Sequence, residues 1–152
     1  MKVYIAGFDV FAADAGARRV RTIEACRARG LVPLHPLDNV AQTSRDIYEG
    51  NVGRIREADV VVANLNPFRG PCEPDAGTAF EVGFARALDK PVWAYADDAS
   101  SMRERMGATD ERGFNVEDFG LPMNLMLAES VTLVQGSFEE CLDELVRQTG
   151  VA

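Results

Sequence analysis

The chain has 152 residues, of which 47% are hydrophobic and 26% charged, a composition typical of a compact globular domain rather than a disordered or fibrous chain. Sixteen Lys and Arg against 24 Asp and Glu give a formal net charge of −8, which argues against nucleic acid or an anionic membrane as a partner. No apolar run is long enough to span a bilayer or to form a secretory leader, so the sequence predicts a cytoplasmic protein. Three widely spaced cysteines fit a reduced compartment.

Short apolar runs alternate with longer amphipathic segments along the chain. The runs predict strands at residues 3–6, 31–34, 59–65, 90–96 and 131–134. The amphipathic segments predict helices at residues 15–29, 44–57 and 77–88, and a last helix that opens at Ser137, where Glu140 completes a capping box. The inner faces of the first two helices are predicted to carry Val20, Ile23, Cys26, Ile47, Val52 and Ile55.

Strands that are apolar on both faces and separated by helices indicate a parallel sheet covered on both sides. The sequence has no internal repeat and no linker, so we expect a single α/β domain over residues 1–152, built as a doubly wound five-stranded parallel sheet in flavodoxin-like order. In such sheets ligands bind beyond the carboxyl ends of the strands. The loops after the first, third and fourth predicted strands are therefore the places to look for chemistry.

The loop after the third predicted strand leads to two carboxylates. Asp75 lies at the predicted helix entrance, and Glu81 follows inside the helix. We expect the helix dipole to favour the ionised form of both, and an ionised, positioned carboxylate is a nucleophile. A carboxylate pair suits cleavage of a glycosidic bond, in which one group attacks the anomeric carbon and an acid protonates the leaving group. The structural alternative makes Asp75 a helix cap and Glu81 a surface residue.

Two further segments can contribute to such a site. Tyr4 can point its phenol toward the edge of the sheet, where Gly7 allows close approach of a substrate; alternatively Tyr4 is a core residue. The polar stretch 97–118 has the length of a lid or a subunit contact, and Asn124 beyond it is either a site residue or a helix cap. The single histidine, His35, fits a packed or solvated role better than a catalytic triad.

The glycine pattern argues against nucleotide cofactors. Residues 66–81 are rich in Gly and Pro but lack Gly-x-x-x-x-Gly-Lys-Ser/Thr, and Gly-x-Gly-x-x-Gly does not follow the first predicted strand. No Cys-x-x-Cys pair or histidine cluster provides metal ligands. We therefore expect neither a cofactor nor a metal.

Five motifs, in the same order along the chain, resemble the nucleoside 2-deoxyribosyltransferase family, and the resemblance covers nearly the whole sequence. They are Val-Tyr-Ile-Ala-Gly at 3–7, Pro-Leu-Asp-Asn at 36–39, Asn51 placed before Ala-Asp-Val-Val-Val-Ala at 58–63, Glu-Pro-Asp-Ala-Gly-Thr-Ala-Phe-Glu-Val-Gly at 73–83, and Pro-Met-Asn-Leu-Met at 122–126. Asn-Pro-Phe-Arg-Gly and Phe-Gly-Leu-Pro are similar to the trypanosome branch. The resemblance implies cofactor-free exchange of purine or pyrimidine bases on 2′-deoxyribonucleosides, as in nucleotide salvage.

The resemblance also implies a role for individual residues. Glu81 matches the nucleophile that attacks C1′ and forms a covalent deoxyribosyl-enzyme, and Tyr4 matches the tyrosine that orients it. Asp75 matches the acidic residue that binds the substrate and handles its proton. Asn124 and Met126 match residues that a neighbouring subunit supplies to the sugar end, so self-association as a dimer or a hexamer is expected.

Four further residues are predicted to bind the substrate: Gly7, Phe8, Asn51 and Gly77. Phe8 and Phe11 can stack on a base, although both fit a core equally well. Base specificity is expected to reside in the loops 8–14 and 38–46. Many relatives carry Asp at the position of Asn51; an amide can form hydrogen bonds but cannot act as an acid at pH 7, so Asp75 is the substitute acid.

Two rival interpretations stay open from the sequence. An N-glycosidase acting on deoxynucleosides or their 5′-monophosphates shares the fold and the glutamate, but the monophosphate enzyme needs a phosphate pocket, and this chain has Asn124 at the lid position with no phosphate-like motif. A non-catalytic nucleotide sensor has no need of the set Tyr4, Asp75 and Glu81. Replacing Glu81 by Ala separates the classes, because a sensor should still bind while an enzyme loses turnover.

Overall fold

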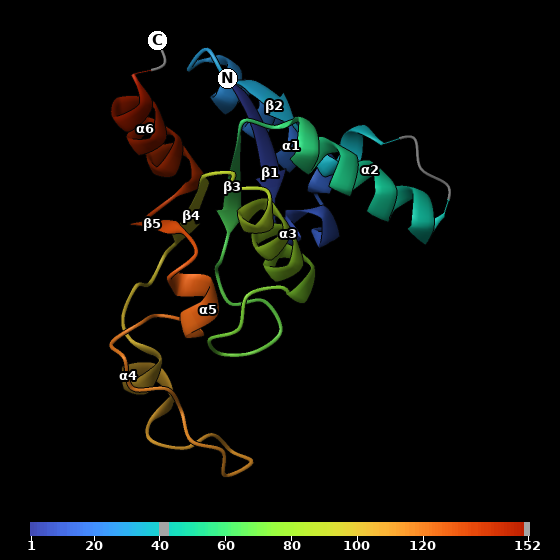
Figure 1. Cartoon of the computed structure of the whole chain (residues 1–152). Helices are drawn as coiled ribbons and strands as arrows, with labels where there is room; N and C mark the ends of the chain where they lie inside the picture. The colour runs from blue at the N-terminus through green and yellow to red at the C-terminus, as the bar shows by residue number, and fades with distance from the viewer. Residues whose placement is uncertain (40–42, 151–152) are drawn as a thin grey trace.

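The computed structural model describes residues 1–39 and 43–150 (Figure 1). Within these residues, five parallel strands form one sheet in the order β2-β1-β3-β4-β5. The strands are β1 (Lys2–Ala6), β2 (Val32–Leu34), β3 (Val60–Asn64), β4 (Val92–Ala96) and β5 (Thr132–Gln135). The pairing and the order confirm the predicted doubly wound α/β sheet with flavodoxin-like topology.

Helices cover both faces of this sheet, because each parallel connection must cross over one of them. On one face lie α1 (Ala15–Arg27) and α6 (Phe138–Thr149), and on the other lie α2 (Ser44–Glu57) and α3 (Ala76–Ala87). The short 3-10 helices η1 (Phe8–Phe11) and η2 (Pro36–Asp38) follow β1 and β2. Two short helices, α4 (Met102–Met106) and α5 (Leu125–Ala128), lie between β4 and β5.

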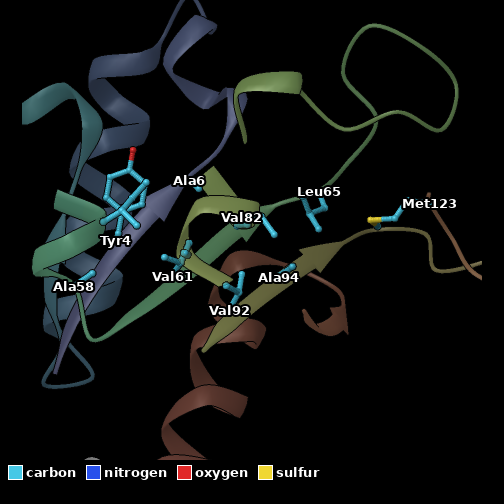
Figure 2. Packing of buried hydrophobic residues seen from close by; sticks show 12 residues of the cluster. Tyr4, Ala6, Ala58, Val61, Leu65, Val82, Val92, Ala94 and Met123 are labelled. Carbon is cyan, nitrogen blue, oxygen red and sulfur yellow. The ribbon is translucent and has the colours of Figure 1, made fainter. Parts of the chain in front are cut away.

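Tyr4 belongs to the apolar core on the α2/α3 face, together with residues such as Val61, Val82 and Met123 (Figure 2). Its side chain is fully buried, and Figure 2 shows the hydroxyl pointing away from the aliphatic side chains. Burying such a ring stabilises the fold by roughly 1.5–3 kcal/mol. The core therefore fixes the phenol in position before any ligand arrives.

The structure corrects two details of the sequence prediction and confirms a third. α1 ends at Arg27 rather than at residue 29, because the chain turns at Gly30, whose φ of 70° lies in the left-handed region. Val20 and Ile47 are each 49% exposed, so their predicted places on the inner faces of α1 and α2 are wrong. The capping box at Ser137 is confirmed, and α6 begins there as expected.

Residues 97–121 form an arm that extends away from the sheet beyond α5 (Figure 1). The arm contains α4 and an antiparallel bridge between Thr109 and Asn115, so it has more regular structure than the loop expected there. Its role as a lid or a subunit contact stays a prediction. In the described part of the chain, no helix is long and apolar enough to cross a membrane.

Candidate active site

A cleft of about 450 Å³ opens between η1, η2, α2 and α3 at the carboxyl ends of β1 and β2. Five predicted site residues line it: Gly7, Asn51, Asp75, Gly77 and Glu81. Gly7 follows β1, Asn51 lies on α2, Asp75 is the N-cap of α3, and Gly77 and Glu81 lie in its first two turns. The sheet topology thus brings together residues that are far apart in the sequence, at the edge where ligands of such folds bind.

Glu81, on the second turn of α3, meets Tyr4 from β1. The Tyr4 hydroxyl donates a hydrogen bond to Oε1 of Glu81 at 2.5 Å, and Nδ2 of Asn51 donates to the same oxygen at 3.4 Å. Burial, together with the nearby Glu81 charge, raises the pKa of Tyr4 far above its ordinary value of 10.0, so the phenol keeps its proton and remains a donor. Both contacts use Oε1, so Oε2 is the oxygen available to a ligand.

The Glu81 carboxyl is less acidic than an exposed glutamate. Burial raises its pKa from 4.5 to about 7; the hydrogen bond from Tyr4 opposes this rise and the charge of Asp75 adds to it. The expectation that the helix dipole keeps Glu81 ionised is therefore wrong, because Glu81 lies beyond the first turn of α3, where the dipole effect has faded and desolvation outweighs it. Near neutral pH, Glu81 exists in both protonation states.

This raised pKa predicts a pH-dependent gain in stability for Glu81→Gln. The folded carboxyl binds its proton more tightly than the unfolded one, so its contribution to stability is fully present below pH 4.5 and is lost as the pH rises through about 7. Glutamine does not titrate. We expect the free energy of unfolding of Glu81→Gln, relative to the parent protein, to increase by about 3 kcal/mol between about pH 4 and pH 8. Urea unfolding at both pH values measures it, and a pH-independent difference contradicts the assignment.

Asp75 is a helix cap that also lines the cleft. Its Oδ2 accepts hydrogen bonds from the backbone N–H of Thr78 at 2.9 Å and from the Thr78 hydroxyl at 3.0 Å, so Asp75 is the N-cap of α3. Asp75 also lines the cleft, and because both of these bonds use Oδ2, its Oδ1 stays available to a ligand. A Cβ on Gly77 would lie 3.0 Å from Oδ2, so a larger residue there would press on this carboxylate.

Gly7 serves packing as well as the cleft. A Cβ at this position would lie 2.9 Å from Cβ of Asn64, which is too close. Buried Asn64 donates from Nδ2 to Asp9 at 2.8 Å and accepts from the backbone N–H of Asn66 at 3.1 Å. This network, which the sequence did not predict, ties the loop after β1 to the loop after β3 and so holds the η1 wall of the cleft.

Phe8 is not brought to the cleft. Its ring stacks on Phe68 with 4.8 Å between centroids, and it is absent from the cleft lining among the described residues. Phe11, which is 61% exposed and stacks on Phe68 at 5.5 Å, lines the cleft instead. Of the two phenylalanines considered for base stacking, the structure therefore favours Phe11.

Asn124 and Met126 lie outside the cleft of their own chain. Asn124 is the N-cap of α5: its Oδ1 accepts from the backbone N–H of Met126 at 3.0 Å, and its Nδ2 donates to Glu117 at 2.6 Å. Met126 is 72% exposed. The capping alternative is thus observed, and the contribution of these residues to a neighbouring subunit stays a prediction.

Part of the apolar lining was missed by sequence reasoning: Leu37 and Ile47 lie outside the predicted specificity loops 8–14 and 38–46, which contain Val10 and Asn39. Val10, Leu37 and Ile47 line the cleft, and so does the polar Asn39. Leu37 and Asn39 belong to the motif at 36–39, whose position at the carboxyl end of β2 is the signal that could have identified them. The loop 38–46 was predicted to determine base specificity. Its residues 40–42 lie outside the described residues.

The cleft carries negative but no positive charge. Asp75 and Glu81 line it, whereas none of the described Lys or Arg residues does. Arg18 of α1 instead forms ion pairs with Asp9 and Asp14. The described residues also contain no group of three or more metal-ligating side chains. The cleft itself suits an uncharged ligand with polar groups and an apolar face, while Arg18 and Arg21 line an adjoining cavity that shares Gly7, Val10 and Pro36 with it.

Comparison with known proteins gives matches in sequence and in fold. The family model for nucleoside 2-deoxyribosyltransferase matches residues 3–126. The structure of a 2-desoxiribosyltransferase from Leishmania mexicana is 39% identical in sequence, with a TM-score of 0.87 over 96% of this chain and 97% of that one.

Two further matches are named as enzymes that hydrolyse N-glycosidic bonds. A protein from Thermofilum pendens named as a 2′-deoxynucleoside 5′-phosphate N-hydrolase is 32% identical over 80% of this chain and 83% of its own length. A CMP N-glycosidase from Clostridium botulinum shares the fold, with a TM-score of 0.56 and 16% identity over 97% of this chain and 99% of that one. Because the family model spans most of the sequence and the Leishmania structure agrees in both fold and sequence, the chain belongs to the nucleoside 2-deoxyribosyltransferase family of enzymes.

Proposed function

We propose that this enzyme transfers the 2-deoxyribosyl group of a 2′-deoxyribonucleoside from one nucleobase to another through a covalent intermediate on Glu81. The observation that carries the proposal is the Tyr4–Glu81 pair: a partly buried carboxylate held at 2.5 Å by a phenol, with its second oxygen free beside a cleft. Such a group is preorganised for attack on carbon.

The reaction has two displacements at the same carbon. Oε2 of Glu81 attacks C1′, the C1′–N bond breaks, and its electron pair leaves with the base. The second base then attacks C1′ from the face the first one left, and the Glu81 carboxylate is released. Tyr4 orients Glu81 throughout, Asn51 holds the same oxygen, and Asp75 binds the substrate through Oδ1 and handles its proton. Gly7 and Gly77 keep the cleft open beside these groups.

A preference for 2-deoxy sugars follows from the chemistry of this step. Positive charge develops at C1′ in the transition state, and a 2′-hydroxyl withdraws electrons from it. Deoxyribonucleosides therefore cleave more readily than ribonucleosides in the same cleft.

Hydrolysis is the second candidate, because the Thermofilum relative is named as an N-hydrolase of 5′-phosphates. A 5′-phosphate calls for cationic side chains, and none of the described Lys or Arg residues lines this cleft. That observation favours free nucleosides as substrates. Transfer rather than hydrolysis further requires that water be kept from the intermediate.

We also propose that the enzyme acts as a homo-oligomer, a dimer or a hexamer, in cytoplasmic nucleotide salvage. Exposed Met126 and the neighbouring Asn124 then complete the cleft of an adjacent subunit and help to exclude water. Purines and pyrimidines are both candidate bases.

Chromatography of a reaction with 2′-deoxyinosine tests the proposed function. Three reactions are compared: one without an acceptor, one with adenine and one with cytosine. Deoxyadenosine or deoxycytidine that forms only with its acceptor supports transfer, and the cytosine reaction defines the range of bases. Release of hypoxanthine and free deoxyribose at the same rate in all three reactions contradicts transfer.

The pH profile of kcat/KM is expected to rise with pH and level off above about pH 7. The ionised carboxylate is the nucleophile, and burial raises the pKa of Glu81 to about 7, so each pH unit below that value removes about nine-tenths of the reactive form. Initial rates of base release over the range where the protein stays folded measure the profile. A flat profile between about pH 5 and 8 contradicts the assignment.

A further inference from the structure

The wall of the cleft formed by η2 and α2 holds two polar atoms without partners. Nδ2 of Asn39 and Oδ1 of Asn51 are both buried, and neither finds a hydrogen-bond partner among the described residues. Both residues line the cleft. Buried amide groups are nearly always hydrogen-bonded in folded proteins, so an unused donor and an unused acceptor on one wall of a cleft point to a ligand.

Gly50 makes room for the Asn39 amide. A Cβ on Gly50 would lie 1.9 Å from Nδ2 of Asn39 and 2.6 Å from its Cγ, so the amide occupies the space that a side chain at this position would need. Gly50 is followed directly by Asn51, whose Nδ2 lies 3.4 Å from Oε1 of Glu81. The Asn39 amide is therefore packed against the same turn of α2 that contacts the nucleophile.

A donor at this place suits the part of a departing base where charge appears. As the C1′–N bond breaks, negative charge builds on the glycosidic nitrogen and on acceptors one carbon away, which are N3 and N7 of a purine or O2 of a pyrimidine. Donors aimed at developing charge are among the strongest contributors to catalysis. Asn51 cannot act as an acid, and none of the described Lys or Arg residues lines the cleft, so the unused Asn39 donor fits this need.

We propose that Asn39 is a further catalytic residue, whose Nδ2–H donates a hydrogen bond to the departing base; this rests on the proposed transfer reaction. The amide gives up no proton. The base departs as its anion, Asp75 in the same cleft then gives it a proton, and Asp75 takes one back from the incoming base when that base attacks, so the exchange consumes none. Leu37 and Ile47, which line the cleft from the same two elements, provide apolar contact for the base.

The test compares base release in a single turnover from two substrates. The base of 2′-deoxyinosine leaves as an anion, whereas the base of 7-methyl-2′-deoxyguanosine leaves neutral and needs no donor. We expect Asn39→Leu to slow hypoxanthine release about 10²-fold and 7-methylguanine release less than about 3-fold. Leu37→Ala, from the same turn, changes the wall without removing a donor and is expected to affect both alike. Equal slowing of both substrates by Asn39→Leu, or no slowing, overturns the proposal.

Two glycines on α2 give a matched pair that leaves Asn39 in the sequence. Gly50→Ala displaces the Asn39 amide, while Gly53→Ala adds the same methyl group where no described atom lies within 4 Å. We expect Gly50→Ala to slow hypoxanthine release as much as Asn39→Leu does, and Gly53→Ala to leave the rate unchanged. Equal rates for the two glycine variants would contradict a role for the contact between the Asn39 amide and Gly50. If the parent protein releases base but Asn39 and Gly50 variants show no substrate dependence, the inference fails and the proposed function stands. If the parent releases no base, the proposed function itself fails.

Discussion

Glu81→Gln is expected to lower the rate of base release by at least about 10⁴-fold, while the nucleoside still binds. Glutamine has nearly the shape of glutamate and its carbonyl can accept the hydrogen bond from Tyr4, but its amide is not a nucleophile for C1′. Chromatography of 2′-deoxyinosine reactions gives the rate, and calorimetric titration gives the affinity.

Glu73→Gln is the matched control for this change. Glu73 is an exposed carboxylate in the loop before α3 and does not line the cleft, so its replacement is expected to leave the rate unchanged. Glu81→Gln activity above roughly one hundredth of the parent rate would show that another group attacks the sugar.

Tyr4→Phe is expected to lower the rate about 10²-fold near pH 7 and less at higher pH. The Tyr4 hydroxyl both orients Glu81 and lowers the pKa of its carboxyl, against the effect of burial. Without this donor, less of the carboxylate is ionised near neutral pH, and the acid limb of the pH profile moves to higher pH. Initial rates from about pH 6 to 9 separate this shift from the loss of orientation, which persists at high pH.

Tyr95→Phe provides the control. Tyr95 lies on β4, packs edge-on against Phe138 and does not line the cleft, so removing its hydroxyl is expected to change neither the rate nor the profile. If the rate of Tyr4→Phe falls equally at every pH, the hydroxyl does not lower the pKa of Glu81 as assigned. If Tyr4→Phe keeps its full rate, the hydroxyl neither lowers that pKa nor orients Glu81 for the reaction.

The fold could be predicted because its signals are local. The strand at 60–64 is buried at every position, which occurs when helices cover both faces of a parallel sheet, and Ser137 and Asp75 begin their helices with the caps that the sequence indicates. The motifs also predicted that Tyr4 and Glu81 would meet, although 77 positions separate them, and they form a hydrogen bond.

The parts that could not be predicted depend on contacts between elements. Ile47 has the spacing of a core residue, yet it lines the cleft. An apolar helix face that binds a ligand has the same sequence pattern as one that packs in the core, so the sequence could not distinguish the two. Phe8 and Phe11 share one 3-10 turn, and only their packing on Phe68 decides which of them reaches the cleft. The raised pKa of Glu81 arises from burial, which no local pattern reports.

The covalent intermediate is the central claim, and mass spectrometry tests it most directly. Enzyme mixed with 2′-deoxyinosine without acceptor is quenched in acid within one turnover and digested with trypsin, which cuts after Arg69 and Arg86 and releases residues 70–86. We expect this peptide to carry one added deoxyribosyl group, located on Glu81 by fragmentation and lost when adenine is present before the quench. Base exchange that proceeds with no adduct, or an adduct on Asp75 instead, would contradict the account.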